Sequence, residues 1–169
     1  MACVKLGSEP DAFQCQRQTW FCTTGLPSDI VVEVGEMSFH LHMFPLLSKS
    51  GVLERLIAEA SESKEECVIH LPGIPSGAKT FELVAKFCYG VKLELKASNV
   101  VYLWCAAENR EMTEEYGEGN LISQAETFFN QVVLRNWKDS LRALQTCDDV
   151  LPYADELIIF MEYFSALAF

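Results

Sequence analysis

The chain has little positive charge, and it lacks the short motifs by which most enzymes are identified. Its 169 residues include 13 Lys and Arg against 24 Asp and Glu, for a formal net charge of -11. Nucleic-acid affinity depends on Lys and Arg that displace counterions from phosphates, so this balance argues against direct nucleic-acid binding. No Gly-rich phosphate loop, Gly-x-Ser-x-Gly turn or His-Glu-x-x-His helix occurs. The sequence therefore predicts a protein that is not an enzyme and has no cofactor.

The cysteines include no Cys-x-x-Cys pair, although there are 7 of them. A widely spaced odd set, with no apolar signal segment in residues 1–9, is typical of a reduced intracellular protein. Cys67, Cys88 and Cys105 are predicted to be buried structural thiols, because no histidine partner for a nucleophile is recognisable. His40 and His42 have a spacing that can serve a metal, but zinc needs three or four ligands, so no metal site is predicted.

Long hydrophobic runs are scarce except at residues 157–169 (LIIFMEYFSALAF). A helix of this length, at about 1.5 Å per residue, reaches only about two-thirds of the way across the hydrocarbon core of a bilayer. The sequence therefore predicts no membrane span. Three alternatives stay open for this segment: packing within the chain, contact with a partner, or a truncated reading frame.

The sequence also predicts a β-hairpin that leads into helices. Ile30–Val34 is a β-branched run, and Met37–Leu41 alternates apolar with polar side chains after the two-residue connection at 35–36. After His42 the hydrophobic period changes from two to about 3.6, which predicts helices within 43–58. Further predictions are a strand at 67–71 in the same small sheet, helices near 77–89, 98–109 and 120–136, and an acidic loop around a short helical turn at 111–120.

Two other local predictions concern the start of the chain and a helix cap. The first 12 residues are polar and are predicted to be a frayed leader, whereas Ser98 is predicted to be an N-cap. Phe13, Trp20 and Phe21 are large apolar residues just before a Leu-Pro turn. They are expected either to close the domain's own core or to form part of a dimer interface, where aromatic residues are enriched.

Several sequence blocks resemble one plant family. They are 19–29 (TWFCTTGLPSD), 39–42 (FHLH) with 44–48 (FPLLS), 82–90 (ELVAKFCYG), 112–121 (MTEEYGEGNL) and 151–157 (LPYADEL). Together they are similar to the N-terminal part of the non-phototropic-hypocotyl/root-phototropism family, over about residues 20–157. This resemblance implies an α+β fold of the BTB/POZ type, in which a small mixed sheet packs against α-helices.

Members of that family look like substrate adaptors of cullin-3 E3 ubiquitin ligases, so the resemblance implies a non-enzymatic role in protein ubiquitination. The implied partners are the cullin-3 scaffold, a second copy or a related BTB protein, and a phototropin-type kinase or auxin-pathway protein. The implied location is the cytoplasm, with the peripheral plasma membrane or the nucleus as alternatives. The alternative function is a BTB oligomerisation module, or a truncated competitor of full-length relatives without adaptor activity.

The resemblance also implies domain boundaries and site residues. The expected units are a leader and dimerisation segment at 1–25, a BTB/POZ domain with C-terminal helices at 26–136, and the start of a truncated helical region with an apolar tail at 137–169. The expected dimer-interface residues are Trp20, Phe21, Asp29, His42, Leu46 and Leu47. The expected cullin-docking residues, within 58–66 and 112–118, are Glu62, Glu65, Met112, Glu114 and Tyr116.

Two features depart from the family pattern. Met43 stands where the family usually has a basic residue, which in BTB dimers can face an aspartate such as Asp29. Asp29 is therefore predicted to lack a close ion pair there, with Lys49 or Arg17 as the remaining candidate partners. The family's long helical domain would start near Leu157 and is absent, which predicts a truncated gene product, a shortened splice form or a misannotated frame.

Overall fold

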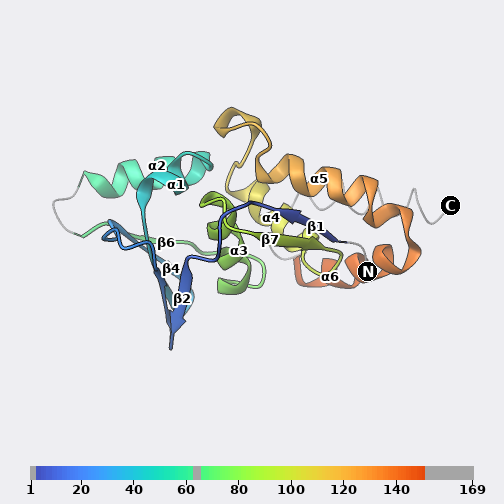
Figure 1. Ribbon diagram of the computed structural model, residues 1–169, viewed down its shortest axis with the longest axis horizontal. Helices are drawn as coiled ribbons and strands as arrows, with labels where there is room; N and C mark the ends of the chain where they lie inside the picture. The colour runs from blue at the N-terminus through green and yellow to red at the C-terminus, as the bar shows by residue number, and fades with distance from the viewer. Residues whose placement is uncertain (1–2, 63–65, 151–169) are drawn as a thin grey trace.

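A computed structural model of the chain describes residues 3–62 and 66–150, and its elements divide between a sheet end and a helical end (Figure 1). The strands are β1 (Cys3–Leu6), β2 (Phe13–Gln16), β3 (Thr19–Cys22), β4 (Ile30–Val34), β5 (Met37–Leu41), β6 (Val68–His70) and β7 (Leu93–Lys96). The helices are α1 (Met43–Leu47), α2 (Gly51–Ser61), α3 (Ala78–Cys88), α4 (Val100–Asn109), α5 (Leu121–Gln131) and α6 (Trp137–Val150), with the short 3-10 helices η1 (Glu114–Tyr116) and η2 (Val133–Arg135). The predicted α+β class is confirmed.

The main sheet has five strands in the order β2-β3-β5-β4-β6. Its central hairpin pairs β4 antiparallel with β5, with Val34 opposite Met37. Gly35 connects them at a φ of 60°, which suits the first central position of a type II′ turn. β3 and β6 flank the hairpin in parallel pairings. The strands predicted at 30–41 and 67–71 are confirmed, and β2 and β3 make the sheet wider than expected.

The start of the chain is not the frayed leader that its polar composition predicts. β1 pairs antiparallel with β7 in a separate two-stranded sheet, with Leu6 opposite Leu93. Both leucines are buried. Figure 1 shows this small sheet at the helical end, so the chain crosses from there to β2 at the other end. The prediction was wrong because a four-residue strand is too short to show a clear hydrophobic period.

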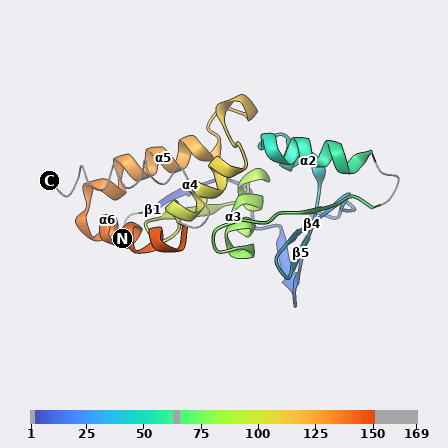
Figure 2. The same cartoon turned by 180° about the vertical axis from the view of Figure 1, so that it is seen from behind.

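Aromatic contacts join the sheet to the helices at α3. Phe39 of β5 and Phe81 of α3 are buried and pack edge to face, with ring centroids 4.8 Å apart. Further into the helical end, Trp104 of α4 and Phe129 of α5 pack at an interplanar angle of 62° and a centroid distance of 5.4 Å. One apolar core therefore extends from the sheet through α3 to α4 and α5. Figure 2 shows α3 between the sheet and α4.

The three predicted structural thiols, Cys67, Cys88 and Cys105, are buried in this core, which confirms the prediction. Burial raises the pKa of the Cys88 thiol to about 12, because the thiolate would lose its hydration. Cys88 is therefore protonated at neutral pH and is a poor nucleophile.

α4 begins differently from the prediction. Asn99, rather than Ser98, occupies the N-cap position, and its side chain does not cap the helix. The Asn99 amide instead holds the preceding turn: its Oδ1 accepts the N–H of Lys96 at 2.9 Å, and its Nδ2 donates to the carbonyl of Glu94 at 2.8 Å. α4 therefore starts with its first N–H groups free of any side-chain cap.

The predictions made for residues 151–169, including the apolar segment at 157–169, lie outside the described residues. Across 3–62 and 66–150, no helix combines the length and the apolar character that crossing a bilayer requires.

Candidate protein-interaction surfaces

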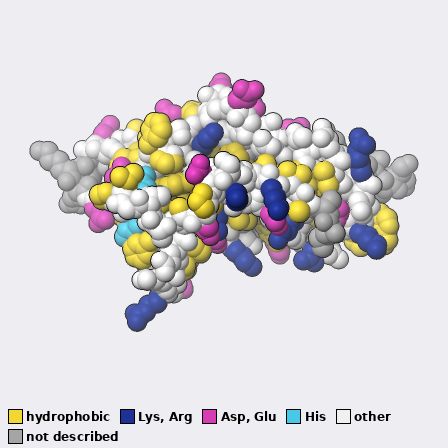
Figure 3. Space-filling model, viewed as in Figure 1, with side chains coloured by type: hydrophobic (Ala, Val, Ile, Leu, Met, Phe, Trp, Pro, Cys, Tyr) yellow, Lys and Arg dark blue, Asp and Glu magenta, His cyan; other side chains and the backbone are white. Residues whose placement is uncertain are grey.

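The first candidate surface, here called the apolar face, exposes large hydrophobic side chains beside the sheet. It consists of Phe21 of β3, Leu26 of the following loop and Phe44 of α1, which are 40%, 69% and 74% exposed. Figure 3 shows hydrophobic side chains next to histidines at the sheet end of the molecule. Exposed aromatic and aliphatic groups grouped in this way are typical of protein-association sites.

Strand pairing and one histidine position the apolar face. Phe21 and His40 are partners across β3 and β5, and their rings stack with centroids 5.1 Å apart. The Nε2 of His42 is 3.2 Å from the carbonyl oxygen of Leu26, and its Nδ1 is 2.9 Å from the hydroxyl of Tyr89. A carbonyl can only accept, so Nε2 donates to it, and in the neutral ring Nδ1 accepts from Tyr89. His42 thereby ties the loop that carries Leu26 to the end of α3.

The six residues predicted for a dimer interface divide between surface and core. Phe21 is exposed, whereas Trp20 is half-buried and stacks on Phe39 with centroids 6.1 Å apart. Leu46 is fully buried, and its assignment to an interface is corrected because α1 directs this side chain into the core. The remaining three are Asp29, which is exposed, and His42 and Leu47, which are half-buried.

Asp29 is occupied by a backbone group. Its Oδ1 accepts the N–H of Met43 at 2.7 Å, at the first residue of α1. This satisfies one of the N–H groups that a helix start leaves without an intrahelical partner. Within 3–62 and 66–150, no Lys or Arg forms a salt bridge with Asp29. An aspartate at this position therefore has a structural partner that does not depend on a basic side chain at 43.

The second candidate surface, here called the acidic ridge, follows α2 and continues onto the loop around η1. Its exposed members are Glu54, Glu59, Glu62, Glu115 and Glu118. At about 100° per residue, Glu59 and Glu62 lie within about 40° of Arg55 around the helix, whereas Glu54 lies about 100° away from it. Clustered carboxylates of this kind attract and orient a basic partner.

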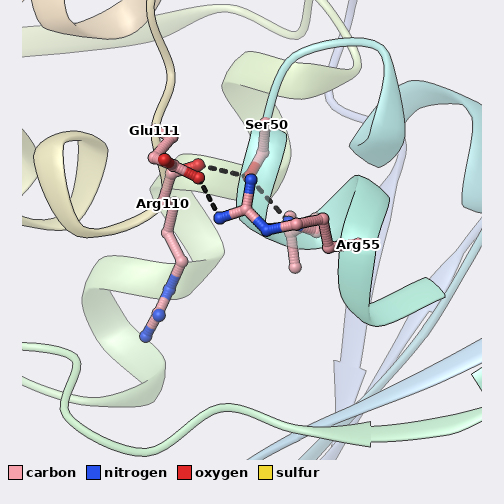
Figure 4. A network of polar contacts seen from close by, with 5 residues as sticks. Ser50, Arg55, Arg110 and Glu111 are labelled. Carbon is pink, nitrogen blue, oxygen red and sulfur yellow. Dashed lines mark hydrogen bonds and ion pairs between the residues drawn. The ribbon is translucent and has the colours of Figure 1, made fainter. Parts of the chain in front are cut away.

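Polar contacts hold the η1 loop against the start of α2 (Figure 4). Arg55 of α2 forms an ion pair with Glu111 at the loop's beginning. The Oγ of Ser50 accepts the N–H of Leu53 at 3.1 Å and so caps α2. The same hydroxyl donates to the carbonyl of Arg110 at 2.6 Å. The loop is therefore fastened to the same residue that begins the helix.

Asn120 fastens the other end of this loop. It is fully buried, and its Nδ2 donates to the carbonyls of Lys49 at 2.9 Å and Thr113 at 2.8 Å. Its Oδ1 accepts the N–H of Leu121 at 2.8 Å, at the start of α5. One side chain therefore joins the turn before α2, the η1 loop and α5.

The predicted cullin-docking residues have different roles in the structure. Glu62 is exposed at the end of α2, and Glu65 lies outside the described residues. Met112 is fully buried, so its prediction as a contact residue is corrected: the side chain packs in the core. The Glu114 carboxylate accepts two backbone N–H groups, of residues 119 and 120, at 3.0 and 2.8 Å. The ring of Tyr116 lies against Gly51, where a Cβ would come within 2.9 Å of it.

The two predicted docking loops thus lie at opposite ends of α2, and the ridge along this helix connects them. Sequence reasoning missed Ser50 and Asn120, although a serine and an asparagine immediately before helical apolar patterns are N-cap signals that could have identified both. It also missed Leu26 and Phe44 as exposed residues.

Comparison with known families and proteins identifies this architecture. The sequence model of the BTB/POZ domain family matches residues 20–132. A BTB/POZ domain-containing protein of Arabidopsis thaliana is 73% identical over 169 residues, which cover 99% of this chain and 25% of that protein. Root phototropism protein 3 of the same plant is 47% identical over 146 residues (86% of this chain, 19% of that protein), and the phototropic-responsive NPH3 family protein NPY1 is 46% identical over 158 residues (93% and 28%). The chain spans about a quarter of the length of the curated relatives it matches. It belongs to the BTB/POZ domain family of protein-interaction modules.

Proposed function

We propose that the chain is the scaffold-binding part of a substrate adaptor for a cullin-3 E3 ubiquitin ligase. The observation that carries this proposal is the acidic ridge, a group of exposed carboxylates on α2 and the η1 loop, where buried polar contacts fasten the loop to the start of α2. A loop fastened to a helix in this way suits docking on a basic surface, because little loop motion is lost on binding. In this proposal the ligase partners supply the ubiquitin chemistry, and the chain supplies none.

The apolar face adds homodimerisation to the proposal. The face exposes apolar side chains to water, namely Phe21, Leu26 and Phe44, and a second copy of the chain would cover them. A two-fold dimer brings the same patch of both copies together. A dimer would present two acidic ridges to two scaffolds. The names of two relatives refer to phototropism, which supports a setting in light-responsive signalling.

A second candidate function is that of an oligomerisation module, or of a competitor for longer relatives, without scaffold binding. The apolar face favours it, because this surface supports self-association whether or not the acidic ridge binds anything. The two functions differ in one property, which is affinity for the cullin-3 N-terminal domain.

Calorimetric titration of the purified chain with the cullin-3 N-terminal domain separates these functions. Reversing two ridge charges, Glu62→Lys with Glu115→Lys, is expected to weaken binding at least tenfold, and added salt should weaken binding by the unaltered chain. The control is Glu36→Lys, which reverses one exposed charge in the β4–β5 turn, and it is compared with each ridge reversal made singly. A chain that dimerises but does not bind the domain at all would leave only the oligomerisation module. Equal loss in the control would remove the acidic ridge as the docking site.

A further inference from the structure

A basic pocket lies at the helical end of this strongly acidic chain, where α3, the β7–α4 turn and α6 meet. Its volume is about 450 Å³, and the polar side chains that line it include Lys79, Thr80, Lys96, Ser98, Tyr102 and Arg142. It shares no residue with the apolar face or the acidic ridge. Among the described residues that line it, three are cations and none is Asp or Glu.

Two helices begin at this pocket with their positive ends open. α3 starts at Ala78 and α4 at Val100; neither has a side-chain cap, and neither has an acidic residue in its first turn. The first N–H groups of a helix carry partial positive charge, which favours an anion nearby. Lys79 lies in the first turn of α3, so a side-chain cation and two helix starts contribute to the same positive region.

The pocket's cations are weakly neutralised by the protein itself. Within 3–62 and 66–150, Lys79 and Arg142 form no salt bridge, and Lys96 reaches only Glu94, at 3.7 Å on the surface. The carboxylate that touches the pocket wall is Asp149, which accepts a hydrogen bond from the Tyr102 hydroxyl at 2.6 Å. Two cations are therefore available to an anion that enters.

A threonine in the wall also faces the cavity. Thr80 is only 3% exposed as a residue and lines the cavity, and its hydroxyl is not one of the fully buried side-chain atoms of the described residues that lack a hydrogen-bond partner. A hydroxyl at a cavity wall is a donor that a bound oxygen can use.

We propose that this pocket binds a phosphomonoester group, carried either by a small molecule or by a phosphorylated side chain. Lys79 and Arg142 pair with its oxygens, since a guanidinium matches phosphate geometry with two parallel donors. Thr80 donates its hydroxyl to the same group, and the N–H groups at the starts of α3 and α4 favour its dianion. The cavity falls within the usual size range of small-molecule sites, so it has room for the carbon portion beside Leu83 and Tyr102.

Calorimetric titration of the whole chain tests this site with three probes: inorganic phosphate, a short phosphoserine peptide, and the same peptide without phosphate. The two phosphate-bearing probes are expected to bind and the unphosphorylated peptide is not. Tighter binding of the phosphopeptide assigns the site to phosphorylated side chains, and tighter binding of inorganic phosphate assigns it to small phosphates. No binding of either phosphate probe, or equal binding of both peptides, overturns the proposal.

Variants then locate the binding. Lys79→Ala with Arg142→Ala is expected to weaken phosphate binding at least tenfold without altering the unfolding temperature, because both side chains are exposed. Thr80→Val, which keeps the shape and removes the hydroxyl, should weaken binding about threefold, in line with the loss of one hydrogen bond. The matched control is Lys92→Ala, an exposed lysine outside the pocket. A control that loses as much affinity as the double variant would show non-specific attraction and overturn the site. If Thr80→Val fails to fold, the exposed pair still decides.

Discussion

The apolar face and the acidic ridge are supported by different kinds of interaction. The strand that carries Phe21 is held by pairing along β2 and β5, so its position depends on many backbone hydrogen bonds at once. The loop at one end of the ridge is held by side chains that reach backbone groups, chiefly Ser50 and Asn120, and by only two backbone hydrogen bonds from the start of α2, at 3.3 and 3.4 Å. Support that is spread over a sheet tolerates single substitutions, whereas support that depends largely on two polar side chains is more sensitive to them.

Asn120→Ala is the substitution that should separate the two regions most. It removes the cap of α5 and leaves the partly buried carbonyls of Lys49 and Thr113 without their donor, so we expect a loss of about 3 kcal/mol in the free energy of unfolding. Urea unfolding measures this loss. Gln131→Ala, on an exposed residue at the far end of α5, should change it by less than about 0.5 kcal/mol. A loss below about 1 kcal/mol for Asn120→Ala would mean that the η1 loop is held by other contacts.

The contrast between the regions also accounts for what the sequence could and could not predict. The β4–β5 hairpin and α3 were predicted because their hydrophobic periods of two and 3.6 run over enough residues to be recognised. β1 and β7 were missed, because each has four residues and their pairing joins segments that are far apart in the sequence. A local sequence pattern does not show which distant strand will pair with a given segment.

The predicted exposure of the site residues was wrong where a helix is too short for its sequence to show which side faces the core. α1 has five residues, fewer than two turns, so its sequence does not show which side faces the core. Leu46 was therefore assigned to the surface, although it is fully buried, and the exposed Phe44 was missed. Met112 was predicted to be a docking residue because it lies in an acidic segment. Composition describes the segment as a whole, whereas each side chain in it can be buried or exposed.

Phe44→Asp tests the apolar face with a smaller expected effect on the fold and a specific effect on association. The side chain is 74% exposed, so its loss should leave the unfolding midpoint almost unchanged. A charge placed in the proposed dimer contact would have to lose its hydration, so we expect the dimer dissociation constant to rise at least tenfold. Light scattering at several concentrations measures it. Trp137→Asp is the matched control, because Trp137 is 72% exposed but lies on α6. Equal weakening by both variants would move the dimer contact away from the apolar face.

The smallest effect is expected at the ion pair of the acidic ridge. Arg55 and Glu111 join α2 to the η1 loop, as Ser50 does, but their side chains are 60% and 47% exposed. An exposed pair gains little, because water solvates both charges and salt screens them. We therefore expect Arg55→Ala, Glu111→Ala and the double variant to unfold within error of the unaltered chain, at low and at high salt. The double variant measures the coupling between the two side chains directly. A coupling comparable to the loss in Asn120→Ala would contradict the view that buried hydrogen bonds to the backbone, rather than surface charge, fix the shape of the ridge.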